Sequence, residues 1–260
     1  MTSTTPSTEP SQSRQPEYES VPSSNWLARL GQNLLEWAEE VIARTSRVGD
    51  KPFFNTADFP WAAESNQHWR GVRDELQQVL QRREELPNFQ DVTPEVGNIN
   101  TDNEWKTFFF YGYGIRCEEN CRLCPQTDAL LRTIPGMKTA FFSILSPGKE
   151  IAPHEGPFKG VLRYHLALIV PEPREQCRIR VADQVAHWRE GECLIFDDRY
   201  DHQVWNETDG LRAVLFVDFE RPCRFPGNLI NKLILNIAGK LPQLRRARRN
   251  HDRWEELFYH

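Results

Sequence analysis

The chain has 260 residues, of which 39% are hydrophobic and 27% charged, and its formal net charge is -5. This composition is typical of a soluble globular protein, and the acidic balance excludes the overall basic footprint of a nucleic-acid-binding protein. No apolar run reaches the roughly 18 residues of a membrane helix. The N-terminus has neither the basic start nor the apolar segment of a secretory signal, so we expect a cytoplasmic location.

Residues 1–24 consist almost entirely of Ser, Thr, Pro, Gln and Glu, which cannot bury enough apolar surface to offset the entropy cost of ordering. We predict a disordered tail there and an amphipathic helix within residues 25–50. Its apolar residues recur at helical spacing: Leu27, Leu30, Leu34, Trp37 and Val41. We expect this stripe to pack on the core; a membrane-surface or partner helix is the second interpretation.

A second amphipathic helix is predicted over residues 66–86, because Trp69, Val72, Leu76 and Val79 share one side and Pro87 ends the pattern. Residues 91–114 mix turn residues with an aromatic run and predict no clear element. At the other end of the chain, residues 226–260 are predicted to form a basic helical extension. The basic run there fits a solvated helix face first, and contact with an anionic membrane or with nucleic acid second.

From residue 139 the pattern changes to short β-branched and aromatic runs separated by Pro, Gly and Asp. Many short strands at close spacing predict a sandwich or barrel rather than an alternating α/β sheet. The expected strands are 139–145, 161–170, 177–182, 185–188, 192–196, 202–206 and 211–219.

Two polar residues share one face of the apolar strand 161–170. Side chains alternate along a strand, so Arg163 and His165 point the same way, while Leu162 and Tyr164 point the other way. A buried polar group without a partner costs about 1 to 3 kcal/mol, and a charge costs more. Either a bound anion or a salt bridge accounts for such a pair.

Three further residues stand at expected strand edges: His154, His202 and Arg212. Imidazoles are common ligands of first-row metals, and a guanidinium binds both oxygens of a carboxylate. A metal that holds a dicarboxylic acid is therefore the first hypothesis for this group.

Several segments around these residues, between roughly Lys51 and Pro222, resemble the aspartyl/asparaginyl β-hydroxylases, which are Fe(II)- and 2-oxoglutarate-dependent dioxygenases that include lipid A hydroxylases. The similarity implies a mainly β fold, a double-stranded β-helix (jelly roll, cupin-like) with flanking helices. It places the dioxygenase domain at 51–225 and its β core at about 139–220. The matching segments are Phe142-Ser-Ile-Leu-Ser-Pro-Gly148, Pro153-His-Glu-Gly-Pro157, Leu162-Arg-Tyr-His-Leu166, Gly191-Glu-Cys-Leu-Ile-Phe-Asp-Asp198, His202-Gln-Val-Trp-Asn206 and Leu211-Arg-Ala-Val-Leu-Phe-Val-Asp218.

The resemblance also implies residue roles. His154 and His202 look like the two iron ligands, and Arg212 looks like the partner of the distal carboxylate of 2-oxoglutarate. Further cosubstrate contacts are implied for Ser143, Arg163 and His165. Most non-haem iron oxygenases add a carboxylate two residues after the first histidine, where this chain has Gly156. The family resembled here works with two histidines, so this gap agrees with it.

By resemblance, the reaction uses Fe(II), 2-oxoglutarate and O2 and hydroxylates an unactivated C–H bond. The first expectation for the substrate is the β-carbon of an Asp- or Asn-type side chain in a peptide or small molecule; a lipid acyl chain is the alternative. Two readings of other classes are a non-catalytic jelly roll that holds a metal and a membrane-associated scaffold. Two arginines suited to a dicarboxylate favour the oxygenase over the binding module.

Six cysteines in a cytosolic chain predict thiols rather than disulfides. Cys117, Cys121 and Cys124 form C-x3-C-x2-C, the spacing of radical S-adenosylmethionine enzymes and of part of a zinc site. The all-β pattern after Cys124 argues against the first, and the lack of an adjacent fourth ligand argues against the second. We expect incidental thiols or a redox-sensitive pair.

Overall fold

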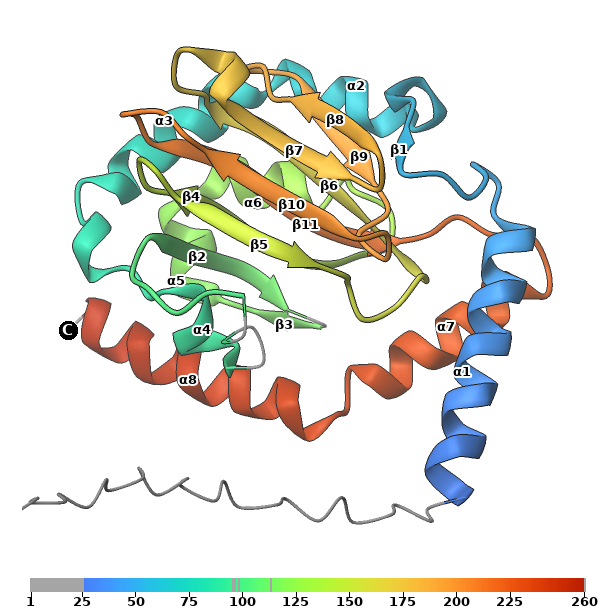
Figure 1. Cartoon of the computed structure of the whole chain (residues 1–260). Helices are drawn as coiled ribbons and strands as arrows, with labels where there is room; N and C mark the ends of the chain where they lie inside the picture. Colours follow the sequence, from blue (N-terminus) through green and yellow to red (C-terminus); the bar gives the residue numbers. More distant parts are fainter. Residues whose placement is uncertain (1–25, 95–96, 98, 113, 260) are drawn as a thin grey trace, which may run out of the picture.

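The computed structural model describes residues 26–94, 97, 99–112 and 114–259 (Figure 1); the predicted tail at 1–24 lies outside them. The helices are α1 Trp26–Thr45, α2 Pro60–Gln67, α3 Trp69–Leu80, α4 Phe89–Val92, α5 Glu118–Leu123, α6 Pro125–Leu131, α7 Gly227–Ala238 and α8 Pro242–Tyr259. The strands are β1 Phe53–Phe54, β2 Trp105–Gly112, β3 Ile115–Arg116, β4 Met137–Leu145, β5 Glu150–His154, β6 Val161–Ile169, β7 Cys177–Val181, β8 Gln184–His187, β9 Cys193–Phe196, β10 His202–Asn206 and β11 Arg212–Glu220.

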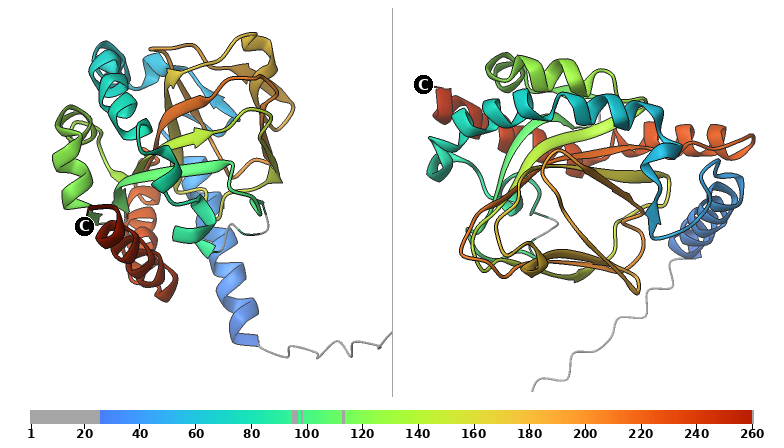
Figure 2. Two further views of the ribbon diagram at one scale, coloured as in Figure 1. Left: turned by 90° about the vertical axis from the view of Figure 1, so that its left-hand side faces the viewer. Right: turned by 90° about the horizontal axis from the view of Figure 1, so that it is seen from above.

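The strands form two antiparallel sheets. The larger has the order β1-β9-β6-β11-β4-β2-β3, and the smaller has the order β5-β10-β7-β8. The chain passes from one sheet to the other between consecutive strands: β4 belongs to the larger sheet, β5 to the smaller sheet and β6 again to the larger sheet. Seen from above, the sheets curve around a common interior and helices line the outside of the larger sheet (Figure 2). The predicted jelly roll with flanking helices is confirmed.

The larger sheet has an apolar core on each of its two faces. Its central strands are therefore buried on both sides. Leu162, Tyr164 and Leu166 of β6 lie on the outer face with residues of α3 and α6. Ala167 of β6 and Phe216 of β11 lie on the inner face, with Ile179 of the smaller sheet. The alternation predicted for residues 161–170 is therefore present, and it directs one set of β6 side chains to the interior of the jelly roll.

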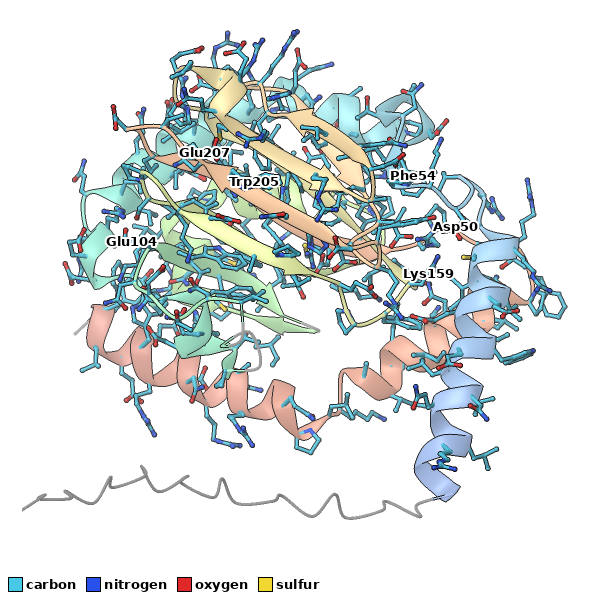
Figure 3. All side chains as sticks on the ribbon, viewed as in Figure 1. Asp50, Phe54, Glu104, Lys159, Trp205 and Glu207 are labelled. Atoms are coloured by element: carbon cyan, nitrogen blue, oxygen red, sulfur yellow. The ribbon has the colours of Figure 1, made fainter. Side chains whose placement is uncertain are left out.

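The smaller sheet is apolar on one face only. Strand β10 alternates between buried and half-buried residues, and β7 does the same. On the outer face, the Arg178 guanidinium lies 4.7 Å from the Trp205 ring centroid and its Nη1 donates to Glu207 over 2.6 Å (Figure 3 labels Trp205 and Glu207). The two histidines lie where β5 ends and β10 begins.

Four strands of the structure were not predicted: the two-residue β1 and β3, and the longer β2 and β5. Residues 105–112 form β2, whose first six residues are all buried, so this strand lacks the period-two pattern of a half-exposed strand. Strand β5 contains Pro153, and three of its five residues are exposed. Proline is tolerated on an edge strand, where its missing N–H is not needed, and β5 is the edge of the smaller sheet.

The predicted helix at 66–86 is in fact two helices, α2 and α3, which meet at His68, followed by a short 3-10 turn. Its expected apolar side is correct, because Val72, Leu76 and Val79 are buried. The break allows α2 to begin at Pro60, a favoured residue in the first turn of a helix.

The expectation that the α1 stripe packs on the core is wrong. Leu30, Leu34 and Trp37 are exposed, whereas Ala38 and Ile42 on another side of α1 are buried. Helix α1 instead packs against α7, and both lie at one edge of the molecule outside the sheets (Figure 1). None of the helices in the described part of the chain combines the length and hydropathy that a membrane span requires.

Candidate active site

The two predicted metal ligands face each other. His154 is the last residue of β5 and His202 the first residue of β10, and the two are paired in register between these strands. Their ring centroids are 4.1 Å apart. Nδ1 of His154 lies 2.8 Å from the carbonyl oxygen of Ala152, and Nδ1 of His202 lies 3.0 Å from that of Tyr200. A carbonyl oxygen only accepts hydrogen bonds, so each Nδ1 carries the proton and each Nε2 keeps a lone pair for a metal.

Both imidazoles are held in the neutral form that a metal requires. Burial lowers the pKa of His154, and burial together with His154 and Arg163 lowers the pKa of His202 to about 3. Metal binding then does not have to displace a proton at neutral pH. The pair can therefore supply two adjacent nitrogen ligands.

Arg212 and His165 are buried polar groups with nitrogen atoms that have no hydrogen-bond partner among the described residues. Arg212, the first residue of β11, is 1% exposed, and its Nε and Nη1 have no hydrogen-bond partner within the described ranges. Its guanidinium lies 4.7 Å from the Trp188 ring centroid, and burial lowers its pKa to about 10. Both ring nitrogens of His165 are likewise unpaired among the described residues. Donors buried at this cost fit an anionic ligand that accepts from them.

Arg163 is different, because carboxylates already pair with it. Its Nε donates to Asp218 Oδ1 over 2.9 Å, and its Nη2 lies 2.7 Å from Asp198 Oδ2. The contact with Asp198 is an ion pair. Neither carboxylate oxygen of Asp198 accepts a hydrogen bond from the described residues. Of the two alternatives left open by the sequence, the salt bridge alone accounts for the charge of Arg163. Its role as a cosubstrate contact stays a prediction.

Asp198 occupies the space that a side chain at position 156 would need. A Cβ atom on Gly156 would lie 2.1 Å from Asp198 Oδ2, so a carboxylate side chain at position 156 does not fit beside Asp198. The Gly156 N–H donates to the Asp198 carbonyl over 2.7 Å, which fixes this approach. Burial raises the pKa of Asp198 to about 7. Glu155, the carboxylate between His154 and Gly156 in the chain, is exposed and pairs with Arg199.

All six predicted site residues line one small cavity between the sheets. Ser143 lies on β4, and its Oγ accepts a hydrogen bond from Trp105 Nε1 over 3.0 Å, which leaves the hydroxyl proton for a ligand. The predicted residues that share this cavity are Ser143, His154, Arg163, His165, His202 and Arg212. The structure thus brings together residues from five strands that are far apart in the sequence.

A second, larger cavity of about 440 Å³ adjoins the first. The two share Trp105, His154, Arg163 and Phe216. The surface of this cavity is mainly apolar, and nine apolar or aromatic side chains contribute to it: Phe89, Val92, Ile99, Trp105, Phe109, Ile115, Phe141, Phe216 and Ala247. Its volume lies within the range of small-molecule sites. His154 therefore borders a mainly apolar chamber large enough for a substrate.

Sequence reasoning missed Asp198 and the walls of this chamber. Asp198 stands four residues before His202, and that short spacing was the available signal. The chamber has no local signal, because α4, β2 and α8 contribute to it from three distant parts of the chain.

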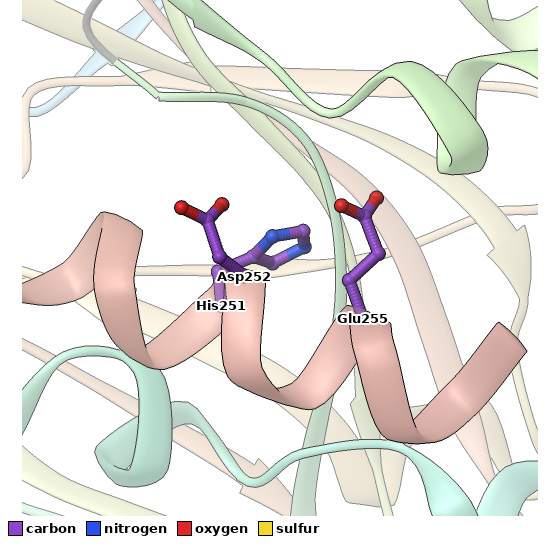
Figure 4. A group of neighbouring side chains, drawn as sticks. All are labelled: His251, Asp252 and Glu255. Carbon is purple, nitrogen blue, oxygen red and sulfur yellow. The ribbon is translucent and has the colours of Figure 1, made fainter. Parts of the chain in front are cut away.

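A second group of ligating atoms lies on α8, where His251, Asp252 and Glu255 offer atoms within 4.8 Å of one another (Figure 4). The His251 ring nitrogens already face polar neighbours, with Cys117 Sγ 3.8 Å from Nδ1 and Asn120 Nδ2 3.4 Å from Nε2. Asp252 is exposed. Because the imidazole is engaged inside the protein, we assign no metal to this group.

The three clustered cysteines are buried free thiols. Burial raises the pKa of Cys117 and Cys124 far above the ordinary thiol value and that of Cys121 to about 12. A thiol with a raised pKa is a poor nucleophile. Of the two expectations, incidental thiols fit better than a redox-sensitive pair.

Comparison with known proteins is informative once this geometry is in view. Residues 66–222 match the family model described as "Aspartyl/Asparaginyl beta-hydroxylase". The chain is 46% identical over 233 residues to the "Ornithine lipid ester-linked acyl 2-hydroxylase" of Rhizobium tropici, covering 90% of this chain and 83% of that protein. It is 34% identical over 160 residues to the "Aspartyl/asparaginyl beta-hydroxylase" of Homo sapiens, covering 60% of this chain but only 20% of the human protein.

Among solved structures, a prolyl-4-hydroxylase of Pseudomonas putida superposes with a TM-score of 0.40 and 18% identity, covering 71% of this chain and 98% of that one. The strand order of the two sheets, described above, carries the assignment of the fold.

Proposed function

We propose, because the chain belongs to the aspartyl/asparaginyl β-hydroxylase family, that it is an Fe(II)- and 2-oxoglutarate-dependent dioxygenase that hydroxylates the acyl chain of a lipid. Its relatives are hydroxylases, so the chain is an enzyme. The cofactor, the cosubstrate and the acyl substrate are the proposed part. A cytoplasmic location, predicted from the sequence, is kept with them.

The residues at the histidine pair fit the proposed cofactors. His154 and His202 would hold the iron through their Nε2 atoms, because both Nδ1 atoms are committed to carbonyl oxygens. Arg212, with Nε and Nη1 free of partners in the described part of the chain, would bind the distal carboxylate of 2-oxoglutarate. Ser143, Arg163 and His165 would complete the seat. Bound iron and 2-oxoglutarate supply the oxidising chemistry, in which 2-oxoglutarate yields succinate and carbon dioxide.

The remaining residues orient the substrate and exclude water. The aromatic side chains of the large cavity keep it apolar up to His154. Transfer of a hydrocarbon chain from water into this cavity is therefore favourable. Asp198 holds the space beside Gly156 and pairs with Arg163, which fixes the polar end of the chamber. The substrate carbon is thereby presented at the border between the two cavities.

One observation carries the choice of an acyl chain over an Asp or Asn side chain: the chamber is mainly apolar. Its two lining arginines are already ion-paired, Arg163 with Asp218 and Arg248 with Asp252. A substrate carboxylate bound to either arginine would lie beside the aspartate that already pairs with it and would be repelled by that aspartate. The first expectation from the sequence, an Asp- or Asn-type β-carbon, therefore becomes the second candidate, supported by the similarity to the human relative.

The test is turnover with both substrate classes. The purified chain is incubated with Fe(II), ascorbate, O2 and 2-oxoglutarate, together with either an acylated amino-acid lipid or an Asp-containing peptide. Succinate and the hydroxylated product are quantified by mass spectrometry. We expect one succinate for each hydroxylated acyl chain and none above background for the peptide; the reverse result would overturn the substrate assignment.

A cavity variant tests the same claim from the protein side. Ala247 on α8 lines the chamber, so Ala247→Phe adds a ring to it without touching the histidines. We expect turnover to shift toward shorter acyl chains while the requirement for 2-oxoglutarate stays unchanged. An unaltered chain-length profile would show that the acyl group binds elsewhere.

A further inference from the structure

Exposed apolar side chains are concentrated on one pair of helices. Of the twelve large apolar side chains that are exposed in the described part of the chain, nine lie on α1, on α7 or next to α7. They are Leu30, Leu34, Leu35, Trp37, Phe225, Leu229, Leu233, Ile237 and Leu241. We call this set the apolar ridge. Clustering of this kind marks an interaction surface, whereas single exposed apolar residues do not.

The ridge is the free side of a well-anchored helix pair. Ile42 of α1 and Leu235 of α7 are buried in one small core with Phe158 of the β domain. The start of α7 comes so close to α1 that a Cβ on Gly227 would lie 1.9 Å from Thr45 Oγ1. Because the opposite sides of both helices are already packed, Leu229, Leu233 and Ile237 have no place in the core.

The chain around α7 and α8 carries the charge that an anionic surface attracts. Residues 224–253 contain eight Lys and Arg and one Asp, a net charge of +7 in a chain whose total is -5. The carboxylates of α1 do not oppose this charge at full strength, since Glu39 pairs with Arg199 and Glu40 with Arg44. A second copy of the same segment would be repelled, so the charge favours an anionic partner over self-association.

The same segment leads to the large cavity. Leu241 of the ridge directly precedes α8, and Ala247 and Arg248 of α8 line the chamber. Figure 1 shows α7 and α8 along the lower side of the sheets, with α1 against α7. The part of the apolar ridge on and beside α7, the basic segment and two residues that line the chamber therefore follow one another within residues 224–253.

We infer that the apolar ridge and the basic segment 224–253 dock this protein on an anionic lipid bilayer, with the ridge inserted among the acyl chains and the basic side chains at the headgroups. This inference rests on the proposed function, because a bilayer is where an acyl substrate resides. An amphipathic surface with a basic flank is the arrangement of interfacial helices.

The experiment measures binding of the full chain to vesicles without iron, 2-oxoglutarate or turnover. Vesicles of phosphatidylcholine alone and of phosphatidylcholine with phosphatidylglycerol are sedimented with the protein at low and high salt. We expect binding to the anionic vesicles that is about tenfold tighter than to the neutral ones and that weakens as salt rises. Equal binding to both kinds, or none, would overturn the inference.

Two matched variants assign the effect to the ridge. Leu229→Glu with Leu233→Glu places two carboxylates on α7, and we expect anionic-vesicle binding to fall about tenfold or more with an unchanged circular dichroism spectrum. Val185→Glu is the control, because Val185 is also exposed but lies on β8 of the smaller sheet. It should bind like the parent. Equal loss in both variants would reject the ridge.

Sedimentation velocity without lipid tests whether a second copy of the chain, rather than a bilayer, covers the apolar ridge. If the parent chain is a dimer that the α7 double variant converts to a monomer, the ridge is a self-association surface and the inference is wrong. We expect both proteins to sediment as the same species.

Turnover on a short-chain lipid dissolved as monomers separates this inference from the proposed function. The α7 double variant should retain parental turnover there, since its changes lie outside both cavities. Vesicle binding without any lipid turnover by the parent would refute the acyl substrate but leave the docking surface standing.

Discussion

Two arginines at opposite ends of strand β11 are equally buried and bonded in opposite ways. Arg212 and Arg221 are each 1% exposed. Arg221 donates from Nε to the Lys159 carbonyl over 2.7 Å and from Nη1 to the Gly49 carbonyl over 3.1 Å, and its Nη2 pairs with Asp197. Arg212 stacks on Trp188, with Nε and Nη1 unpaired among the described residues.

The difference separates a structural charge from one suited to binding a ligand. Burying a charge is costly unless partners compensate it, and folding alone compensates Arg221. Figure 3 labels Lys159 and Asp50, which surround the Arg221 end of the strand and bond to each other over 2.9 Å. Nε and Nη1 of Arg212 have no such partners among the described residues. A ligand that accepts hydrogen bonds from them would offset the cost of burying this charge.

The largest change in the free energy of unfolding should follow from replacing Arg221, the arginine that is fully paired within the protein. Arg221→Met leaves the Asp197 carboxylate buried and unpaired, and we expect the free energy of unfolding to fall by about 3 to 5 kcal/mol. Urea denaturation measures this change. Arg178→Met, which breaks an ion pair on the outer face of the smaller sheet, is the control and should cost less than about 1 kcal/mol. Equal losses would remove the contrast between buried and exposed pairs.

Changing the other arginine should alter binding and leave stability nearly intact. For Arg212→Gln we expect the half-saturating concentration of 2-oxoglutarate to rise about 10- to 150-fold, since a charged hydrogen bond contributes about 1.5 to 3 kcal/mol. Succinate formation against 2-oxoglutarate concentration measures the shift. The free energy of unfolding should change little, because Nε and Nη1 have no hydrogen-bond partner to lose among the described residues and only the contact with Trp188 is altered. A large destabilisation with unchanged half-saturation would assign Arg212 a structural role like that of Arg221.

A carboxylate introduced at position 156 should destabilise the protein. Gly156→Asp puts a side chain where Asp198 already lies, and we expect a loss of about 1 to 3 kcal/mol in the free energy of unfolding, as for an overpacked core position. Gly31→Asp, at an open position of α1, is the control for the added charge. A Gly156→Asp protein of parental stability would show that Asp198 moves away freely.

The smallest effect should come from a paired carboxylate nearer the surface. Burial raises the pKa of Asp128, but hydrogen bonds from Arg116, Tyr111 and Arg132 outweigh it and lower the pKa to about 2. A pKa below the unfolded value stabilises the fold above about pH 4, and this stabilisation is lost as pH falls toward 2. We expect Asp128→Asn to lower the free energy of unfolding by about 1 kcal/mol at pH 7 and to abolish that part of the acid dependence. Parallel stability curves for parent and variant between pH 7 and 2 would contradict this.

The sequence predicted what depends on local periodicity. The common face of Arg163 and His165 follows from strand alternation, and so does the opposite orientation of Leu162. What it did not predict depends on contacts between distant segments. The approach of Asp198 to Gly156 joins two separate loops, and the return of α8 to the chamber could not be read from its basic run.

Helix α1 shows the same limit from another side. Its apolar stripe is real, but amphipathicity alone does not specify what covers the apolar side. Ala38 and Ile42 were less conspicuous in the sequence than Leu30 and Leu34, yet they are the buried ones because α7 and Phe158 meet that side of the helix.

The central claim is that His154 and His202 hold one iron beside a seat for 2-oxoglutarate, and anaerobic binding tests it most directly. Fe(II) is added to the metal-free parent, His202→Ala and Arg212→Gln, followed by 2-oxoglutarate, while bound iron and the visible charge-transfer absorption of the iron chelate are measured. We predict one iron per chain and a saturable absorption band for the parent, a band requiring more 2-oxoglutarate for Arg212→Gln, and neither iron nor band for His202→Ala. Stoichiometric iron bound by His202→Ala with parental affinity would contradict the account.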